Sequence, residues 1–90
     1  MAIIGLDVEA VETLSSNLKH QGSAIDTVIS AIDGLVNHIP SIWKGHDADQ
    51  FINWWTSQHK PALIQVRDHV NGLGDSAHNN AQAQAEVSNH

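Results

Sequence analysis

The fold is decided by residues 11–42, which read VETLSSNLKHQGSAIDTVISAIDGLVNHIPSI. Apolar residues recur in this stretch in two series, each with a period of seven, and the second series is offset from the first by three. The two series are Val11, Leu18, Ile25, Ile32, Ile39 and Leu14, Gln21, Val28, Leu35, Ile42. Only Gln21 is polar, and a 3-4 spacing sustained over this length predicts a long amphipathic helix with a coiled-coil seam rather than a strand.

The ends of this first helix are predicted from its flanking residues. Asp7 stands where an N-cap belongs, and acidic residues in the first turns suit the positive end of the helix dipole. Pro40 disfavours helical geometry at Ile39, which precedes it. We therefore predict a helix over residues 8–38 and a turn over residues 40–46.

A second helical signature begins at Asp47, where Gln50, three residues on, makes a variant capping box. Pro61 lies inside the pattern and predicts a kink. The chain then becomes polar and alanine-rich, with little to bury, so we predict a second helix over residues 47–79 and a flexible tail over residues 80–90. The apolar residues of this second pattern are Ala48, Phe51, Trp55, Ala62, Val66, Val70, Leu73 and Ala77.

These elements predict an all-α fold, an antiparallel helical hairpin forming a single domain over residues 1–90. Two helices alone present a long apolar face with nothing on its far side, and so small a core rarely stabilises itself. A second hairpin packed on the first, in a four-helix bundle, buries that face. The residues predicted at this dimer interface are Val11, Leu14, Leu18, Ile25, Val28, Ile32, Leu35, Phe51, Trp55 and Val66.

Two residues of this pattern leave alternatives open. Gln21 either fixes the register of the pair by approaching its own copy or lies at the edge of the seam and reaches water. Trp54 points about 100° away from Trp55 on a helix, so it is either a flank of the interface or an exposed anchor for another protein. Trp55 shares the apolar stripe and is expected in the core.

The composition excludes several classes of partner. Ten acidic residues stand against four basic ones, giving a net charge of −6, and an acidic surface disfavours nucleic acid and anionic membranes. There is no cysteine, so disulfides and thiolate zinc sites are excluded. No cleaved secretory signal is recognisable, and no segment approaches the roughly 20 apolar residues of a membrane span. If the protein is exported, we expect a route that reads no cleaved leader.

Catalysis and metal binding also find little support. Seven histidines are present, but none forms the i, i+4 pair that places two imidazoles on one helical face. The serines lie in helical patterns without a glycine-rich elbow, and the paired carboxylates Asp47 and Asp49 flank a helix start, where capping explains them. We therefore expect no enzyme, no cofactor, no metal site and no small-molecule substrate.

The predicted turn contains Trp43-Lys44-Gly45, a Trp-x-Gly tripeptide between two long amphipathic helices. Phe51 and Trp55 follow one turn apart. In this arrangement the chain resembles the WXG-hundred (ESAT-six-like) family of type VII secretion substrates over nearly its whole length. There is also a physical reason for the residues: Gly45 can adopt positive φ, and Trp43 offers a large apolar surface to a groove at the bundle end.

The resemblance implies a helical hairpin that pairs with itself or with a paralogous Trp-x-Gly protein. It implies export in the folded state through a membrane-bound FtsK/SpoIIIE-like ATPase, and therefore a secreted protein. A Tyr-x-x-x-Asp/Glu signal in the C-terminal tail of one chain is typical of the actinobacterial members. This chain has no tyrosine: Glu86 fills the acidic position and Gln82 occupies the aromatic one. Either a partner chain carries the signal, or the route reads another feature.

A second function stays open beside secretion. The chain could be an intracellular helical adaptor, such as a chaperone for a larger toxin or effector that has a similar helical domain. A small ligand- or metal-binding bundle is a third possibility, which the Trp-x-Gly turn disfavours.

Overall fold

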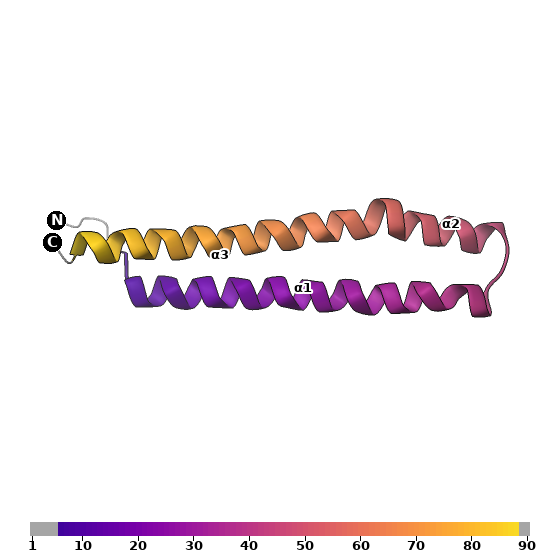
Figure 1. Cartoon of the computed structure of the whole chain (residues 1–90), viewed down its shortest axis with the longest axis horizontal. Coiled ribbons are helices and arrows are strands. Elements are labelled where there is room, and N and C mark those ends of the chain that lie inside the picture. The colour runs from indigo at the N-terminus through magenta and orange to yellow at the C-terminus, as the bar shows by residue number, and fades with distance from the viewer. Residues whose placement is uncertain (1–5, 89–90) are drawn as a thin grey trace.

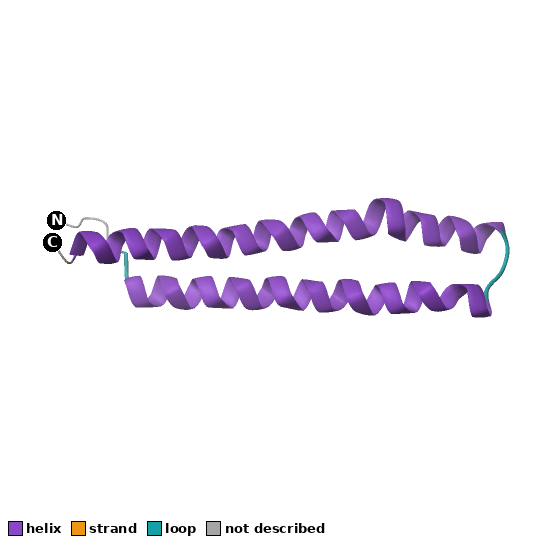
Figure 2. Cartoon of the chain, in the orientation of Figure 1, coloured by secondary structure: helices purple, strands orange, loops and turns teal. Residues whose placement is uncertain are grey.

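The computed structural model describes residues 6–88 as a narrow helical rod, 67 × 16 × 15 Å. Helix α1 (Val8–Ile42) forms one arm. The other arm consists of α2 (His46–Trp54), a π-helical turn η1 (Trp55–His59) and α3 (Lys60–Ser88). The arms run antiparallel and side by side, and the start of α1 lies with the end of α3 at the pole opposite the turn (Figure 1). Every element of residues 6–88 is helical (Figure 2), which confirms the predicted all-α hairpin.

The N-cap predicted for α1 is present, but the predicted end of this helix was wrong. The backbone N–H of Ala10 donates a 3.0 Å hydrogen bond to Asp7 Oδ1. At the other end, α1 continues through Pro40 to Ile42. Ile39, which Pro40 should push out of helical geometry, is buried against the second arm, and this packing holds it in the helix. Because Pro40 has no N–H, the helical hydrogen bond to the Val36 carbonyl is missing in this last turn, but the N–H of Trp43 still bonds to the Ile39 carbonyl at 2.8 Å.

The turn between the arms is shorter than predicted, because only residues 43–45 lie outside the helices. Gly45 has φ 114° and ψ 179°, a conformation that is essentially restricted to glycine, and it is the N-cap of α2. The predicted capping box was wrong: α2 begins at His46, and no side chain caps it. The prediction of a positive φ at Gly45 is confirmed.

Pro61 is accommodated by the π-helical turn that precedes it. In an α-helix the proline ring would clash with the carbonyl group four residues earlier. Here the N–H of Lys60 bonds to the carbonyl of Trp55, five residues back, so the turn is one residue wider. The wider turn is visible in the ribbon between the labels α2 and α3 (Figure 1).

The C-terminal segment is helical as far as Ser88, so the prediction of a flexible tail from residue 80 was wrong there. Residues 89–90 lie outside the described residues. Two contacts explain the difference. Ala81 is 0% exposed between the arms, and the Gln82 side-chain amide donates a 2.9 Å hydrogen bond to Glu12 Oε2. Small side chains let this part of α3 approach α1 closely, and polarity alone did not reveal that.

The core between the arms is thin, and one of its rows was not predicted because half of its residues have no large apolar side chain. Ser15, Gly22, Ile29 and Val36 are buried and spaced by seven along α1. The first predicted series, from Val11 to Ile39, lies beside this row and is half-buried or buried. Ser15 Oγ donates a 2.8 Å hydrogen bond to the Gly74 carbonyl oxygen, so the backbones approach each other at small residues.

Candidate interaction surface

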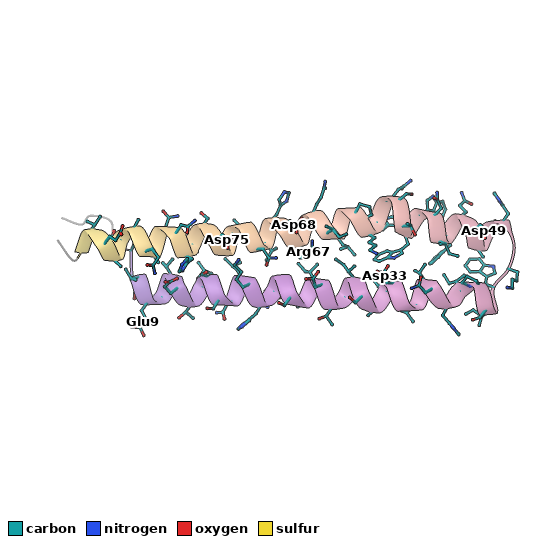
Figure 3. The ribbon with its side chains drawn as sticks, in the orientation of Figure 1. Glu9, Asp33, Asp49, Arg67, Asp68 and Asp75 are labelled. Atoms are coloured by element: carbon teal, nitrogen blue, oxygen red, sulfur yellow. The ribbon has the colours of Figure 1, made fainter. Side chains whose placement is uncertain are left out.

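One side of the hairpin carries a row of polar bridges between the arms. The α1 members are spaced by seven residues. Each follows directly after a half-buried residue of the first apolar series, which runs through Val11, Leu18, Ile25 and Ile32. Figure 3 shows the side chains of Asp33 and Arg67 in the space between the ribbons. The bridges are Glu12–His78 at 2.7 Å, Lys19–Asp75, Asp26–Arg67 at 2.6 Å and Asp33–Lys60 at 2.7 Å.

The carboxylates of this row are held in their charged form. The Lys60 ammonium, and after it the Trp55 indole N–H, keep the pKa of Asp33 below its ordinary value. Hydrogen bonds from His78 and then Gln82 lower the pKa of Glu12. The pKa of Arg67 is raised, first by Asp26 and then by the neighbouring Asp68. The Glu12, Asp33 and Arg67 side chains are half-buried and still reach water, so solvent screens their attraction and the row serves mainly to fix how the arms align.

The other side of the hairpin carries exposed apolar residues at the same seven-residue spacing. On α1 they are the second predicted series, and Leu35 and Ile42 are 70% and 71% exposed. On the second arm they include Val66, Leu73 and Val87. We call these two rows together the apolar face. Its exposed members are Leu14, Val28, Leu35, Ile42, Phe51, Trp54, Val66, Leu73 and Val87.

That both rows lie on one side follows from helical geometry. On α1 each apolar position follows a bridging residue by two, as Val28 follows Asp26, which is about 200° round the helix. On α3 the order is reversed, because Asp75 follows Leu73 by two. The arms are antiparallel, so their rotation senses are opposite, and the reversed order places both apolar rows opposite the polar bridges.

The apolar face is richest in aromatic residues near the turn. The rings of Trp43 and Phe51 contact each other with centroids 5.7 Å apart, tilted by 57°. Beside them lies a shallow pocket of about 290 Å³, between α1 and the second arm. Trp54 lines it and is half exposed, which is compatible with both interpretations of this residue, as a flank of an interface and as an exposed anchor. The pocket is lined by Ile32, Val36, Phe51, Trp54, Trp55 and His59.

The residues predicted at a dimer interface fall into two groups. Those of the first series lie between the arms, and Trp55 is 7% exposed and hydrogen-bonded to Asp33, so it belongs to the core of its own hairpin, as expected for this residue. The others lie on the apolar face, open to solvent. The first group is Val11, Leu18, Ile25, Ile32 and Trp55, and the second is Leu14, Val28, Leu35, Phe51 and Val66.

The predicted turn and tail residues lie at opposite poles of the rod. Trp43 and Gly45 are exposed at the turn, where Trp43 is 42% exposed and is the C-cap of α1. Gln82 and Glu86 lie on the last turns of α3. Gln82 bonds to Glu12, whereas Glu86 is exposed. Within residues 6–88 these two pairs of residues therefore lie at opposite ends of a rod 67 Å long.

The residues predicted at a dimer interface did not include Leu73 and Val87, which are exposed on the apolar face. Their signal was present in the sequence, because Val66, Leu73 and Val87 share one seven-residue register. The close approach of the arms at Gly22 was missed as well. A Cβ there would lie 2.0 Å from Asn71 Oδ1, so the space beside Gly22 is filled by the Asn71 side chain.

Across residues 6–88 no group of three or more His, Asp or Glu side chains is placed to hold a metal ion, and the six histidines in that range are exposed. No helix in the same range is long and apolar enough to cross a membrane.

Taken together, these features define a helical hairpin with a Trp-x-Gly turn and one uncovered apolar face. A family model described as "Proteins of 100 residues with WXG" matches residues 3–87. The chain therefore belongs to this WXG family, as its Trp43-Lys44-Gly45 turn predicted. No curated protein and no solved structure matches it significantly. Members of the family are small non-enzymatic helical proteins associated with secretion, and they typically pair with partner proteins.

Proposed function

We propose that this chain is a small interaction protein exported by type VII secretion, either as a substrate or as the dimer partner of one. The observation that carries the proposal is the uncovered apolar face, which runs the length of a hairpin whose turn is Trp-x-Gly. A face of this kind favours association with another helical protein over catalysis. Its partners in this role are a second hairpin and the secretion ATPase.

Pairing into a four-helix bundle is supported by how little one hairpin buries. Six hydrophobic residues among those described form its buried set, and the largest of them is Trp55. Side chains such as Leu35 and Ile42, more than two-thirds exposed, would enter a core if a second hairpin covered them. Each such leucine or isoleucine contributes about 1.5–3 kcal/mol when fully buried.

For export, we propose that recognition by the FtsK/SpoIIIE-like ATPase depends on a partner chain with an aromatic tail signal. Gln82 stands at the aromatic position of this chain and is bonded to Glu12, so it offers less apolar area to a receptor than an aromatic ring would. Glu86 remains exposed at the acidic position. The two residues are a weak export signal in this proposal.

The second candidate is an intracellular adaptor for a larger effector with a similar helical domain. It is favoured by one observation: the segment that would carry an export signal is docked on α1 through Ala81 and Gln82. In that case the apolar face would cover the effector's helices, and the chain would remain inside the cell.

The deciding experiment measures secretion of the full chain in a host with an active type VII system. The host is compared with and without a co-expressed second Trp-x-Gly hairpin protein that carries the aromatic tail signal, and with and without the secretion ATPase. We expect ATPase-dependent export that rises when the partner is present. Retention of the chain in the cytoplasm under all four conditions, while its effector is secreted, would support the adaptor instead.

A further inference from the structure

The residues of the second arm that face α1 follow a regular spacing that breaks at one place. In α2 the inward residues Ala48, Ile52 and Trp55 recur at steps of four and three, as one face of an α-helix requires. Between Trp55 and Lys60 the step is five, and residues five apart on an α-helix lie about 140° apart round its axis. From Lys60 onward the steps are again four or fewer. The buried and half-buried residues of α3 are Lys60, Leu63, Ile64, Arg67, Val70, Asn71, Gly74, Ala77, Ala81, Gln84 and Ala85.

Asp33 on α1 contacts both residues at this break. The indole N–H of Trp55 donates a 2.8 Å hydrogen bond to Asp33 Oδ1, and the Lys60 ammonium lies 2.7 Å from Asp33 Oδ2. The backbone shows how one carboxylate reaches both, because the N–H of Lys60 bonds to the carbonyl oxygen of Trp55, five residues back. A π-helical turn of this kind brings residues five apart to the same side of the helix. The side-chain contacts and the backbone hydrogen bond therefore place one extra residue in the same turn.

Without the extra residue, polar side chains would face the core near the Trp-x-Gly turn. Steps of seven residues stay on one face of an α-helix to within about 20°. Such steps, counted back from Leu63 and Lys60, lead to three residues that are exposed in the structure, and each directly follows a residue that does face α1. The three exposed residues are Thr56, Asn53 and Asp49, and the inward ones are Trp55, Ile52 and Ala48. An unbroken α-helix would thus bury polar groups in the apolar cluster, which costs free energy unless they find partners.

The same shift of one residue aligns the two halves of the apolar face. Counted back from Val66 in steps of seven, the exposed row of α3 would continue at His59 and Ile52. In the structure Ile52 is half-buried, and the exposed apolar residue is its neighbour Phe51. Trp54 lies beside it at the apolar pocket. A rotation of α2 by one residue, about 100°, would turn Phe51 and Trp54 away from the row of Val66.

We infer that η1 is a register-setting insertion: its extra residue turns α2 by about 100° relative to α3, so that the core and the apolar face continue across the junction. Asp33 supports this arrangement by bonding to residues on both sides of the extra one. Pro61 lacks an N–H and so tolerates a wide turn before it, but a proline by itself kinks a helix without changing its register by one residue. The inference goes beyond the proposed function, and no result on export bears on it.

A deletion and an insertion at the same place test the register. Deleting Ser57 leaves Trp55 and Lys60 four residues apart, which an α-helix places on one side. We expect this variant to keep its helicity and a Tm within about 5 °C of the natural chain. Inserting one alanine after Ser57 separates the two residues by six, and we expect the Tm to fall by more than about 15 °C. An ordinary helix would be harmed by both changes, and a loop would tolerate both.

The indole N–H signal of Trp55 in a proton–nitrogen NMR spectrum, assigned with Trp55→Phe, reports the packing itself. We expect it to remain protected from exchange in the deletion variant and to lose protection in the insertion variant. Deletion of Ser30, an exposed serine of α1 where the spacing is regular, is the control and should be as harmful as the insertion. If deleting Ser57 is as harmful as deleting Ser30, or if the insertion is tolerated as well as the deletion, the inference is overturned.

Pro61→Ala separates the register from the proline as the cause of the wide turn. If the proline alone produced it, alanine would return the segment to an unbroken α-helix and rotate α2, so Thr56 and Asn53 would face the core. We expect instead that the Trp55 indole signal stays protected and that the Tm is unchanged or higher, because alanine has the better helix propensity. Loss of the protected signal together with a lower Tm in Pro61→Ala would overturn the inference.

Discussion

The indole N–H of Trp55 donates a 2.8 Å hydrogen bond to Asp33 Oδ1, and this contact ties the π-helical turn to α1. Asp33 belongs to the row of polar bridges, so the Trp55 ring is directed toward that side of the hairpin. The preceding residue, Trp54, lies about 100° away round the helix and is left on the apolar face. Trp55 is thus 7% exposed and bonded to α1, whereas the adjacent Trp54 is 45% exposed.

The first prediction follows from this bond. Trp55→Phe keeps an aromatic ring in the core but removes the indole donor, and we expect it to cost about 1–2 kcal/mol of unfolding free energy. That would lower the Tm by about 4–8 °C per kcal/mol for a chain of this size. A double-mutant cycle with Asp33→Ala, followed by circular dichroism at one protein concentration, isolates the pair. Purely additive effects of the two changes would show that the bond contributes nothing.

A second prediction concerns pH. Because the pKa values of Asp33 and Glu12 are lowered in the folded chain, the folded state favours their charged forms. Their contribution is therefore present above the ordinary carboxyl pKa and is lost as the pH falls through the lowered values. We expect the Tm to fall below about pH 5, and less steeply in the double variant Asp33→Asn/Glu12→Gln. An identical acid profile for variant and natural chain would contradict the assignment.

The third prediction separates two glycines on the same helix. Nothing lies within 4 Å of a Cβ added at Gly34, so Gly34→Ala should raise stability by up to about 1 kcal/mol through helix propensity. At Gly22 the same Cβ meets the Asn71 side chain, which must move and lose its packing. Gly22→Ala should therefore gain less or destabilise. Adding Asn71→Ala to Gly22→Ala should recover the gain in helix propensity, because the clash with the Asn71 side chain is then removed. Chemical denaturation measures the unfolding free energy of all three variants.

The fourth prediction concerns the C-terminal segment, which polarity and composition alone predicted to be a flexible tail with little to bury. Truncation after Asn80 removes Ala81, which is fully buried, and the Gln82 contact with Glu12. We expect a loss of about 1–2 kcal/mol and a lower Tm. The substitution Ala81→Asp in the full chain should be at least as harmful, because it places a charge between the arms. An unchanged Tm after truncation would show that the segment does not dock.

Large apolar residues made most of the fold predictable, and small residues account for most of what was missed. The series through Val11 and Leu14 predicted α1, and the demand for a sharp reversal predicted the backbone at Gly45. The buried row through Ser15 and Gly22 has no apolar signature, since those positions are used for close approach and not for hydrophobic burial. The same holds for Ala81 near the C-terminus.

Predictions from local sequence signals, such as a proline at a helix end, were wrong where tertiary contacts favoured another structure. Pro40 marks a helix end by its own geometry, but the buried Ile39 keeps the helix intact. The apolar face was predictable as a need for a partner, because two helices cannot cover each other fully. The sequence did not predict which of the two apolar series of α1 is buried and which is exposed, because both have the same seven-residue spacing. Only the polar bridges, which lie beside the buried series, distinguish the two.

The last prediction asks whether the Trp-x-Gly turn acts in export beyond its role in the fold. Trp43 is 42% exposed and contacts Phe51, so Trp43→Ala should cost less than the roughly 3 kcal/mol lost when a fully buried aromatic residue is truncated. A core variant such as Ile29→Val, or Val36→Ala if a larger loss is needed, can be matched to it in Tm.

If Trp43 only stabilises the turn, the two matched variants should be secreted to the same extent. We predict that Trp43→Ala is secreted at least several-fold less, because an exposed tryptophan at the end of a rod is available to a receptor whereas Ile29 is not. Secreted and cytoplasmic fractions, measured by immunoblot in the same host and normalised to total protein, decide between them, and equal secretion of the matched pair would remove any role for Trp43 in recognition.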